Sequence, residues 1–150
     1  MTGSMHRSAW WLLVLLLALC HAARADDKAD RVLGDWLTQQ NKGVVRLFRN
    51  DAGLIDGRIV GGDHPDRVDS NNPDPAQRQT LLRGKVIARG FRFDGESYWT
   101  GGTIYDPNNG STYKCRMRLN AEGQLEVRGY IGTPLLGRTA VWTRMKAPDQ

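Results

Sequence analysis

The chain has 150 residues, with 21 Lys and Arg against 16 Asp and Glu, and a formal net charge of +5. Its basic side chains are interleaved with acidic ones, whereas a nucleic-acid-binding surface would gather them on one face. We therefore expect no nucleic-acid partner. The length suffices for one domain with one hydrophobic core.

The N-terminal segment has the three parts of a secretory signal peptide. A cationic start at His6 and Arg7 leads into an uninterrupted apolar stretch over residues 9–20. This stretch is shorter than the about 20 residues that a membrane-spanning helix needs. The Ala-Arg-Ala sequence at 23–25 then matches the small-x-small pattern that signal peptidases cut. We expect residues 1–25 to be a cleaved signal peptide.

Cleavage near Ala25 predicts a periplasmic or secreted protein without a transmembrane segment; an uncleaved N-terminal anchor is the alternative. Cys20 raises the further alternative of an acylated lipoprotein, but Leu19 argues against it, because lipoprotein signals place a small residue directly before the cysteine. With Cys20 removed, Cys115 is the sole cysteine, so no intramolecular disulfide can form. Cys115 alternates with apolar residues, which favours a buried, inert thiol over a nucleophile.

The rest of the chain has the pattern of an all-β protein. Its apolar runs are short, rich in Val, Ile, aromatics and Gly, and separated by turn signals. The expected strands lie at 34–40, 43–50, 54–62, 81–93, 97–106, 112–119, 124–131 and 137–144. Residues 26–33 are an N-terminal lead-in, 34–146 the β-domain and 147–150 a C-terminal tail.

The turns between these strands are mostly short hairpin loops. Examples are Asn-Gly at 109–110, Asp-Gly at 94–95 and the loop at 120–123, which ends in Gly. About eight sequential antiparallel strands predict an up-and-down barrel, because closure removes exposed sheet edges. The interior of such a barrel is either filled by side chains or holds one small ligand.

One connection is much longer than a hairpin loop. Residues 61–79 are polar, and we expect them to form a long loop or short helix that covers one end of the barrel. Asp74 suits a helix N-cap, Pro75 suits the first helical position, and Gln77 stands where a capping box places its glutamine.

The same connection holds weak candidates for metal ligands. These are Asp63, His64, Asp66 and Asp69, whose spacing matches no EF-hand loop and lacks its central Gly and closing Glu. Solvated loop charges are the favoured interpretation. We expect no metal site and no cofactor.

The sequence contains no convincing catalytic constellation. His64 is the only histidine left after signal cleavage, and no Gly-x-Ser-x-Gly elbow is present. Asp94 and Glu96 flank a turn glycine and have the pattern of ordinary solvated turn residues. We expect the protein not to be an enzyme.

Aromatic residues point to binding more than to reaction. Most of them must belong to the core of a chain this small. Tyr98 and Trp99 are adjacent in one expected strand, so only one of them can face inward. The other remains on the surface or under the long loop, where an apolar or sugar-like ligand could stack.

Two motifs at the ends of the β-domain form a structural signature. Gly34 and Trp36 open its first strand, and Trp142 and Arg144 close its last. This resembles the Gly-x-Trp motif and C-terminal Arg of lipocalin-like (calycin) barrels. The resemblance implies that Arg144 packs on Trp36, a cation–π contact worth about 0.5–2 kcal/mol.

Longer stretches are similar to one exported bacterial family. "NPDPAQR", "YWTGGTIYDPNNGSTYKCRMRL" and "LEVRGYIGTPLLGRTAVWTR" resemble the family known as domain of unknown function two-one-four-seven. The resemblance implies a lipocalin-like fold and an envelope location and assigns no reaction. "NAEGQ" at 120–124 departs from the Thr-Asp-Tyr motif of lipocalins.

These observations favour a periplasmic binding module for a small apolar or amphipathic molecule. The expected lining of its barrel is formed by Tyr113, Met117, Leu119, Leu125 and Val127. An envelope interaction or structural module with a filled barrel and a protein partner is the alternative. A hydrolase is the third hypothesis, and it would require His64 or Cys115 beside a second polar group in a pocket.

Overall fold

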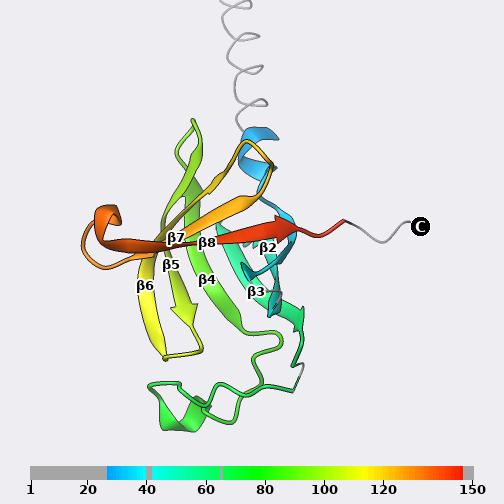
Figure 1. Cartoon of the computed structure of the whole chain (residues 1–150), viewed down its shortest axis with the longest axis vertical. Helices are drawn as coiled ribbons and strands as arrows, with labels where there is room; N and C mark the ends of the chain where they lie inside the picture. The colour runs from blue at the N-terminus through cyan, green and yellow to red at the C-terminus, as the bar shows by residue number, and fades with distance from the viewer. Residues whose placement is uncertain (1–26, 40–41, 65, 147–150) are drawn as a thin grey trace, which may run out of the picture. The chain divides into compact units, whose positions relative to one another are not determined.

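The computed structural model describes residues 27–39, 42–64 and 66–146 (Figure 1). The chain divides into two compact units, residues 1–31 and 32–150. The predicted signal peptide and its cleavage site lie outside the described residues, as does the expected C-terminal tail. No helix within the described ranges is long and apolar enough to cross a membrane.

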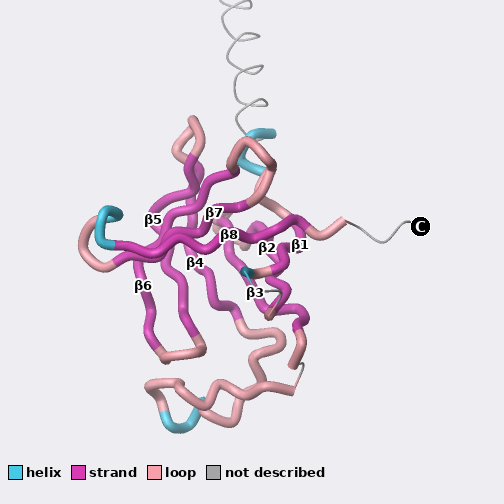
Figure 2. Tube along the Cα trace, in the orientation of Figure 1, coloured by secondary structure: helices cyan, strands magenta, loops and turns pink. Residues whose placement is uncertain are grey.

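The described part of the second unit is a closed barrel of eight antiparallel strands (Figures 1 and 2). Each strand pairs with the next one in the chain, and the last strand pairs with the first. The strands are β1 (Gly34–Leu37), β2 (Gly43–Arg49), β3 (Ile55–Gly62), β4 (Val86–Phe93), β5 (Tyr98–Asp106), β6 (Ser111–Leu119), β7 (Leu125–Tyr130) and β8 (Gly137–Arg144). The predicted all-β, up-and-down barrel is confirmed.

One predicted strand begins later than expected. The sequence predicts extended structure over 81–93, whereas β4 begins at Val86. The Lys85 N–H instead donates a hydrogen bond to the Leu82 carbonyl at 3.0 Å, which forms a turn directly before the strand. Residues 81–85 therefore belong to the long connection between β3 and β4, which we call the crossover (residues 63–85).

The core is built from the inward faces of all eight strands. Its buried members are Val32, Trp36, Val45, Leu47, Ile55, Ile87, Ala88, Phe91, Trp99, Cys115, Met117, Leu125, Val127 and Trp142. The packing is tight: a Cβ atom added at Gly102 would lie 2.6 Å from the Phe91 ring. Glycine is therefore required at this position, because a side chain would overlap the ring.

Trp36 and Arg144 meet where β1 and β8 close the barrel. They are register partners, and the Arg144 Cζ atom lies 4.2 Å from the centroid of the Trp36 ring. Arg144 Nη1 also donates a hydrogen bond to the Leu33 carbonyl at 2.8 Å, and Trp36 Nε1 donates to the Val32 carbonyl at 2.8 Å. The guanidinium–indole contact expected from the sequence is present.

The crossover lies against the turn between β5 and β6, at the lower end of the barrel in Figure 1. Asn71 Nδ2 donates hydrogen bonds to the carbonyls of Pro107 and Asn108, at 3.0 Å each. Gly110 has a φ of +71°, and a Cβ atom there would overlap the Asn71 carbonyl. These contacts fasten the long loop to the end of one hairpin.

The crossover contains the single helical turn η2 (Pro75–Gln77). Asp74 caps it as expected, because its Oδ1 atom accepts a hydrogen bond from the Ala76 N–H at 3.0 Å. The Gln77 side chain instead accepts a hydrogen bond from the Thr80 hydroxyl at 3.2 Å. Gln77 therefore stabilises the residues that follow the turn.

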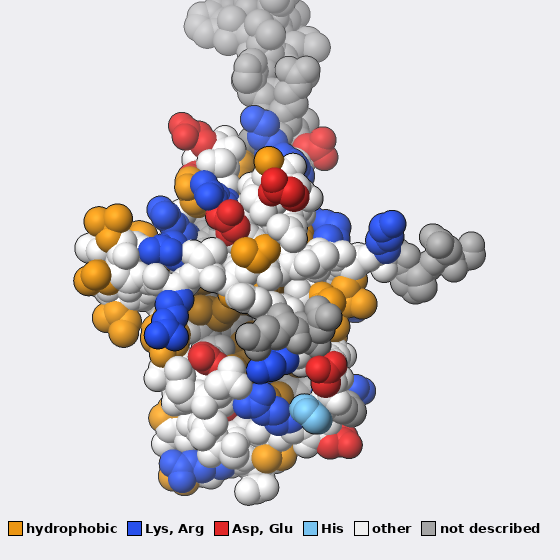
Figure 3. Space-filling view, viewed as in Figure 1, with side chains coloured by type: hydrophobic (Ala, Val, Ile, Leu, Met, Phe, Trp, Pro, Cys, Tyr) orange, Lys and Arg blue, Asp and Glu red, His pale blue; other side chains and the backbone are white. Residues whose placement is uncertain are grey.

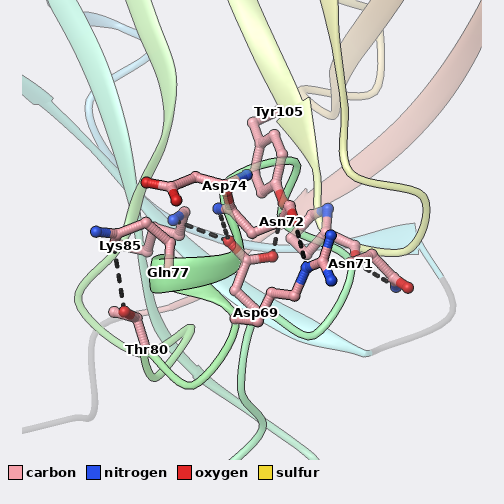
Figure 4. A network of polar contacts seen from close by, with 10 residues as sticks. Asp69, Asn71, Asn72, Asp74, Gln77, Thr80, Lys85 and Tyr105 are labelled. Carbon is pink, nitrogen blue, oxygen red and sulfur yellow. Dashed lines mark hydrogen bonds and ion pairs between the residues drawn. The ribbon is translucent and has the colours of Figure 1, made fainter.

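A buried polar network holds the crossover to β5 (Figure 4). The Asp69 carboxylate, which is 0% exposed, accepts hydrogen bonds from Tyr105 and Asn72, each at 2.6 Å, and forms an ion pair with Lys85 at 2.8 Å. Burial by itself would raise the Asp69 pKa, but the three partners outweigh it and hold the pKa below its usual value. Burial and the neighbouring carboxylate raise the pKa of Tyr105 to about 12.

Candidate functional site

A groove of about 450 Å³ lies on the outer face of the barrel. We call it the outer groove. Successive residues of a strand point to opposite faces, so its strand residues, apart from the core residue Met117, alternate with buried residues such as Trp99, Cys115 and Val127. The groove is lined by Tyr98, Arg116, Met117, Arg118, Glu126, Arg128, Pro134, Leu135 and Thr139.

The register of β6 and β7 determines the charge pairs in the outer groove. Arg118 lies opposite Glu126, and their Nε and Oε2 atoms are 2.6 Å apart. This hydrogen bond raises the pKa of Arg118. The next pair on this face joins two like charges, because Arg116 lies opposite Arg128. Like charges directly opposite on neighbouring strands destabilise a sheet.

Arg128 forms one wall of the outer groove by binding the connection between β7 and β8. Its guanidinium donates hydrogen bonds to the Pro134 carbonyl at 2.6 Å and to the Leu135 carbonyl at 3.3 Å. A third bond reaches the Thr139 hydroxyl at 2.8 Å. This connection contains the helical turn η3 (Pro134–Leu136). The Arg128 donors therefore serve chiefly to position the wall.

Arg116 differs from Arg118 and Arg128 in the partners of its guanidinium. Its Cζ atom lies 4.9 Å from the centroid of the Tyr98 ring, a cation–π arrangement. Within the part of the chain that the structure describes, the Arg116 guanidinium has no carboxylate partner. Its N–H donors are thus available to an anion in the outer groove.

The outer groove combines cations with apolar and aromatic surface. Tyr98 is the outward member of the pair of aromatics at 98–99, while Trp99 is 3% exposed and belongs to the core. Tyr98 lies in this groove and not beneath the crossover. Together with Pro134 and Leu135, it can contact the apolar part of a ligand whose anionic part meets Arg116.

A second hollow of about 270 Å³ lies between the crossover and the outer face of β4 to β6. It is lined by Asn72, Pro73, Lys85, Val86, Ile87, Arg89, Thr103, Tyr105 and Thr112. Usual ligand pockets begin at about 300 Å³. Three of its polar residues, Asn72, Lys85 and Tyr105, already bind Asp69, so this hollow is the weaker candidate.

Three of the five residues predicted to line a cavity inside the barrel are core residues. Met117, Leu125 and Val127 are 1%, 0% and 4% exposed, and all pack in the same cluster. Leu119 packs against this cluster. Tyr113 lies over Gly129, and its hydroxyl accepts a hydrogen bond from Asn109 at 3.0 Å. Leu125 and Val127 thus pack against other core side chains, and Met117 is the one residue of these five that also lines the outer groove.

The weak metal candidates do not converge. The Asp69 carboxylate is bound to its three protein partners, whereas Asp63, His64 and Asp66 are exposed. Over residues 27–39, 42–64 and 66–146, no group of three His, Cys, Asp or Glu side chains is placed to hold a metal ion.

The residues considered for catalysis lie apart from the outer groove. Cys115 is 0% exposed in the core, and burial raises its thiol pKa to about 12. His64 is exposed on the crossover. Asp94 is a turn residue, because its Oδ1 atom accepts hydrogen bonds from the N–H groups of Glu96 and Ser97.

Sequence reasoning missed the arginines of the outer groove. A signal was available, because a hairpin centred on the loop at 120–123 places Arg116 opposite Arg128 and Arg118 opposite Glu126. The sequence contains no comparable signal for the wall formed by Pro134 and Leu135, since no residue pattern within that connection predicts where it packs.

Comparisons with known proteins agree with this architecture. The profile of a family described as "Uncharacterized protein conserved in bacteria (DUF2147)" matches residues 34–144. The structure is similar to that of protein HP1028 from the human pathogen Helicobacter pylori, described as belonging to the lipocalin family, with a TM-score of 0.69 and 24% identity. The match covers 77% of this chain and 83% of that one. No functionally curated protein matches the sequence.

Proposed function

The chain belongs to this family of uncharacterised bacterial proteins and has a lipocalin-like fold, and we propose that it is a binding protein whose ligand is a small amphipathic molecule with an anionic group. The proposed site is the outer groove. One observation carries the proposal. Arg116 on β6 lies directly opposite Arg128 on the neighbouring strand β7, and it has no carboxylate partner among the described residues.

An anion in the outer groove would remove the cost of this like-charge pair. A carboxylate or phosphate can accept charge-assisted hydrogen bonds from Arg116, and such bonds are stronger than those between neutral groups. The apolar part of the ligand would lie along Tyr98 and Leu135. A volume of about 450 Å³ falls within the usual range for small-molecule sites, about 300–1,000 Å³.

Packing inside the barrel favours the outer face over the interior as the ligand site. The predicted lining residues Leu125 and Val127 are 0% and 4% exposed. A ligand between them would have to displace well-packed side chains, which destabilises a core. We place the encounter with the ligand in the periplasm, on the strength of the predicted signal peptide.

The test is titration of the purified protein with dodecanoate, dodecyl phosphate and uncharged dodecanol. We expect both anions to bind more tightly than dodecanol. Arg116→Gln should weaken dodecanoate binding about tenfold or more, since a hydrogen bond to a charged group contributes about 1.5–3 kcal/mol. Native mass spectrometry of protein purified from the periplasm would show a co-purified molecule.

Arg92→Gln is the matched control, because Arg92 is an exposed arginine on β4 that does not line the outer groove. It should leave dodecanoate binding unchanged. Equal affinity for dodecanoate and dodecanol, or unchanged binding by the Arg116 variant, would reject the proposal.

A second candidate function is an interaction or structural module of the cell envelope. The close packing of the barrel interior favours it, since a filled barrel leaves only its surface for recognition. Crosslinking in the periplasm tests this candidate. Failure to capture a defined protein partner would argue against it.

A further inference from the structure

Three large apolar side chains gather on the connection between β7 and β8. Ile131, Leu135 and Leu136 are 71%, 88% and 77% exposed, and we call them the apolar tip. The other two large apolar residues with high exposure in the described ranges, Leu81 and Met145, are 48% and 43% exposed. In Figure 3 the apolar tip forms the orange cluster at the left, where Figure 1 places η3.

The structure holds this connection in place. Arg128 donates hydrogen bonds to the carbonyls of Pro134 and Leu135, and the Leu136 N–H donates to the Thr133 carbonyl at 3.1 Å. A fixed backbone that presents exposed aliphatic side chains indicates an interaction surface.

Two exposed basic residues lie at the base of the apolar tip. Lys114 lies opposite Tyr130 at the end of β7, and Arg138 lies opposite Gly129 at the start of β8. Residues 127–146 contain no Asp or Glu. Glu126, the acidic residue of the adjoining groove, is already paired with Arg118. This surface is therefore complementary to an anionic partner.

We propose that the apolar tip docks on the surface of a bilayer that contains anionic phospholipids. Aliphatic side chains enter the boundary between headgroups and acyl chains, while Lys and Arg beside them attract anionic headgroups. A protein partner fits less well, because a stable protein interface needs about 20–30 residues on each side. The apolar tip offers three side chains on a projecting loop.

Docking is separable from ligand binding in the outer groove. Leu135 contributes to both surfaces, but Ile131 and Leu136 do not line the groove. A double variant, Ile131→Ser with Leu136→Ser, therefore alters the apolar tip and retains the residues that line the groove.

The experiment is co-sedimentation of the protein with vesicles of phosphatidylcholine alone, or of equal parts phosphatidylcholine and phosphatidylglycerol. We expect binding to the anionic vesicles, weakened by added salt. The double variant should bind them about tenfold less tightly or worse, because it loses aliphatic insertion. Leu81→Ser makes the same chemical change on the crossover and should bind like the unaltered protein.

The charge contribution is tested separately. Arg138→Gln should weaken binding to anionic vesicles, whereas Arg92→Gln, which removes one charge elsewhere on the barrel, should not. Circular dichroism confirms folding, and retained dodecanoate binding by the double variant shows that the outer groove is intact.

Several results would overturn the proposal. The proposal is wrong if the protein does not bind anionic vesicles, if it binds both kinds of vesicle equally, or if the double variant binds as tightly as the unaltered protein. Crosslinking from position 136 to a defined protein, together with no vesicle binding, would replace the bilayer with a protein partner.

Discussion

The guanidinium of Arg144 lies on the indole of Trp36, with Cζ 4.2 Å from the ring centroid, and joins the last strand of the barrel to the first. The β1–β8 seam contains two register pairs, Trp36 with Arg144 and Leu37 with Thr143. Because few backbone pairs join β1 to β8, side-chain contacts must also contribute to the closure of the barrel.

Replacing Arg144 should destabilise the fold. Arg144→Gln removes the cation–π contact and the hydrogen bond to the Leu33 carbonyl, so we expect the free energy of unfolding to fall by about 1–2 kcal/mol. Urea unfolding followed by tryptophan fluorescence measures it. Arg138→Gln on the same strand should change it by less than about 0.5 kcal/mol. An unchanged midpoint for the Arg144 variant would show that the contact does not stabilise closure.

Reversing the charge of Arg116 should separate stability from binding. Arg116→Glu places a carboxylate opposite Arg128, and we expect the free energy of unfolding to rise by about 0.2–1 kcal/mol. The same variant should lose dodecanoate binding. Arg118→Glu is the matched comparison, because it creates a like-charge pair with Glu126 and should lower stability. Equal stability of the two variants would contradict the assigned pairing.

The buried Asp69 carboxylate should be a major support of the crossover. Asp69→Asn leaves Lys85 without its counter-charge, and breaking a buried ion pair costs about 3–5 kcal/mol. We expect a loss of about that size at neutral pH, measured by urea unfolding. Asp63→Asn, an equivalent change at an exposed position of the same segment, should have little effect.

The effect of Asp69→Asn should also depend on pH. The pKa of Asp69 is lower in the folded protein than its usual value of 3.8. Its stabilising contribution is therefore complete above that value and is lost as pH falls through the folded pKa. The pKa values of Asp35 and Asp94 are also lowered. These two residues change the stability of the unaltered protein and of the variant equally, so their contribution cancels in the difference. The stability difference between the unaltered protein and the variant should shrink in acid; a constant difference would contradict this assignment.

Cys115 should resist alkylation in the folded protein. Burial raises its thiol pKa to about 12 from a reference of 9.0, and each unit reduces the reactive thiolate about tenfold at a given pH. Peptide mapping after iodoacetamide treatment should show labelling about a thousandfold slower in buffer than in concentrated urea. Rapid labelling of the native protein would place the thiol at the surface.

Apart from the start of β4, the residue pattern was sufficient to predict the strands and hairpins. Alternation with period two in the run at 112–119 separates buried from exposed residues, and glycines at 95, 110 and 123 mark turns with positive φ. The contact of Arg144 with Trp36 could also be predicted, because both residues belong to the motif of a known barrel. These features depend on neighbours along the chain or on a shared motif.

Only the tertiary structure determined which of Tyr98 and Trp99 faces inward. Both belong to one strand whose alternation is interrupted, because the register shifts between Trp99 and Gly102 and Gly101 has a φ of +77°. A bulge shifts the residues that follow it to the other face of the sheet. The alternation of residues after the bulge therefore does not tell which of Tyr98 and Trp99, which precede it, faces inward.

The tertiary structure alone also located the candidate site. The outer groove exists because Arg128 binds the carbonyls of Pro134 and Leu135 and folds that connection over the outer face. The same applies to Asp69, which meets Tyr105 across 36 positions of sequence. Sequence alone determined the strands, the turns and the barrel, because those follow from local periodicity and turn geometry. The groove and the buried network depend on side chains that meet segments distant in sequence, which no local pattern specifies.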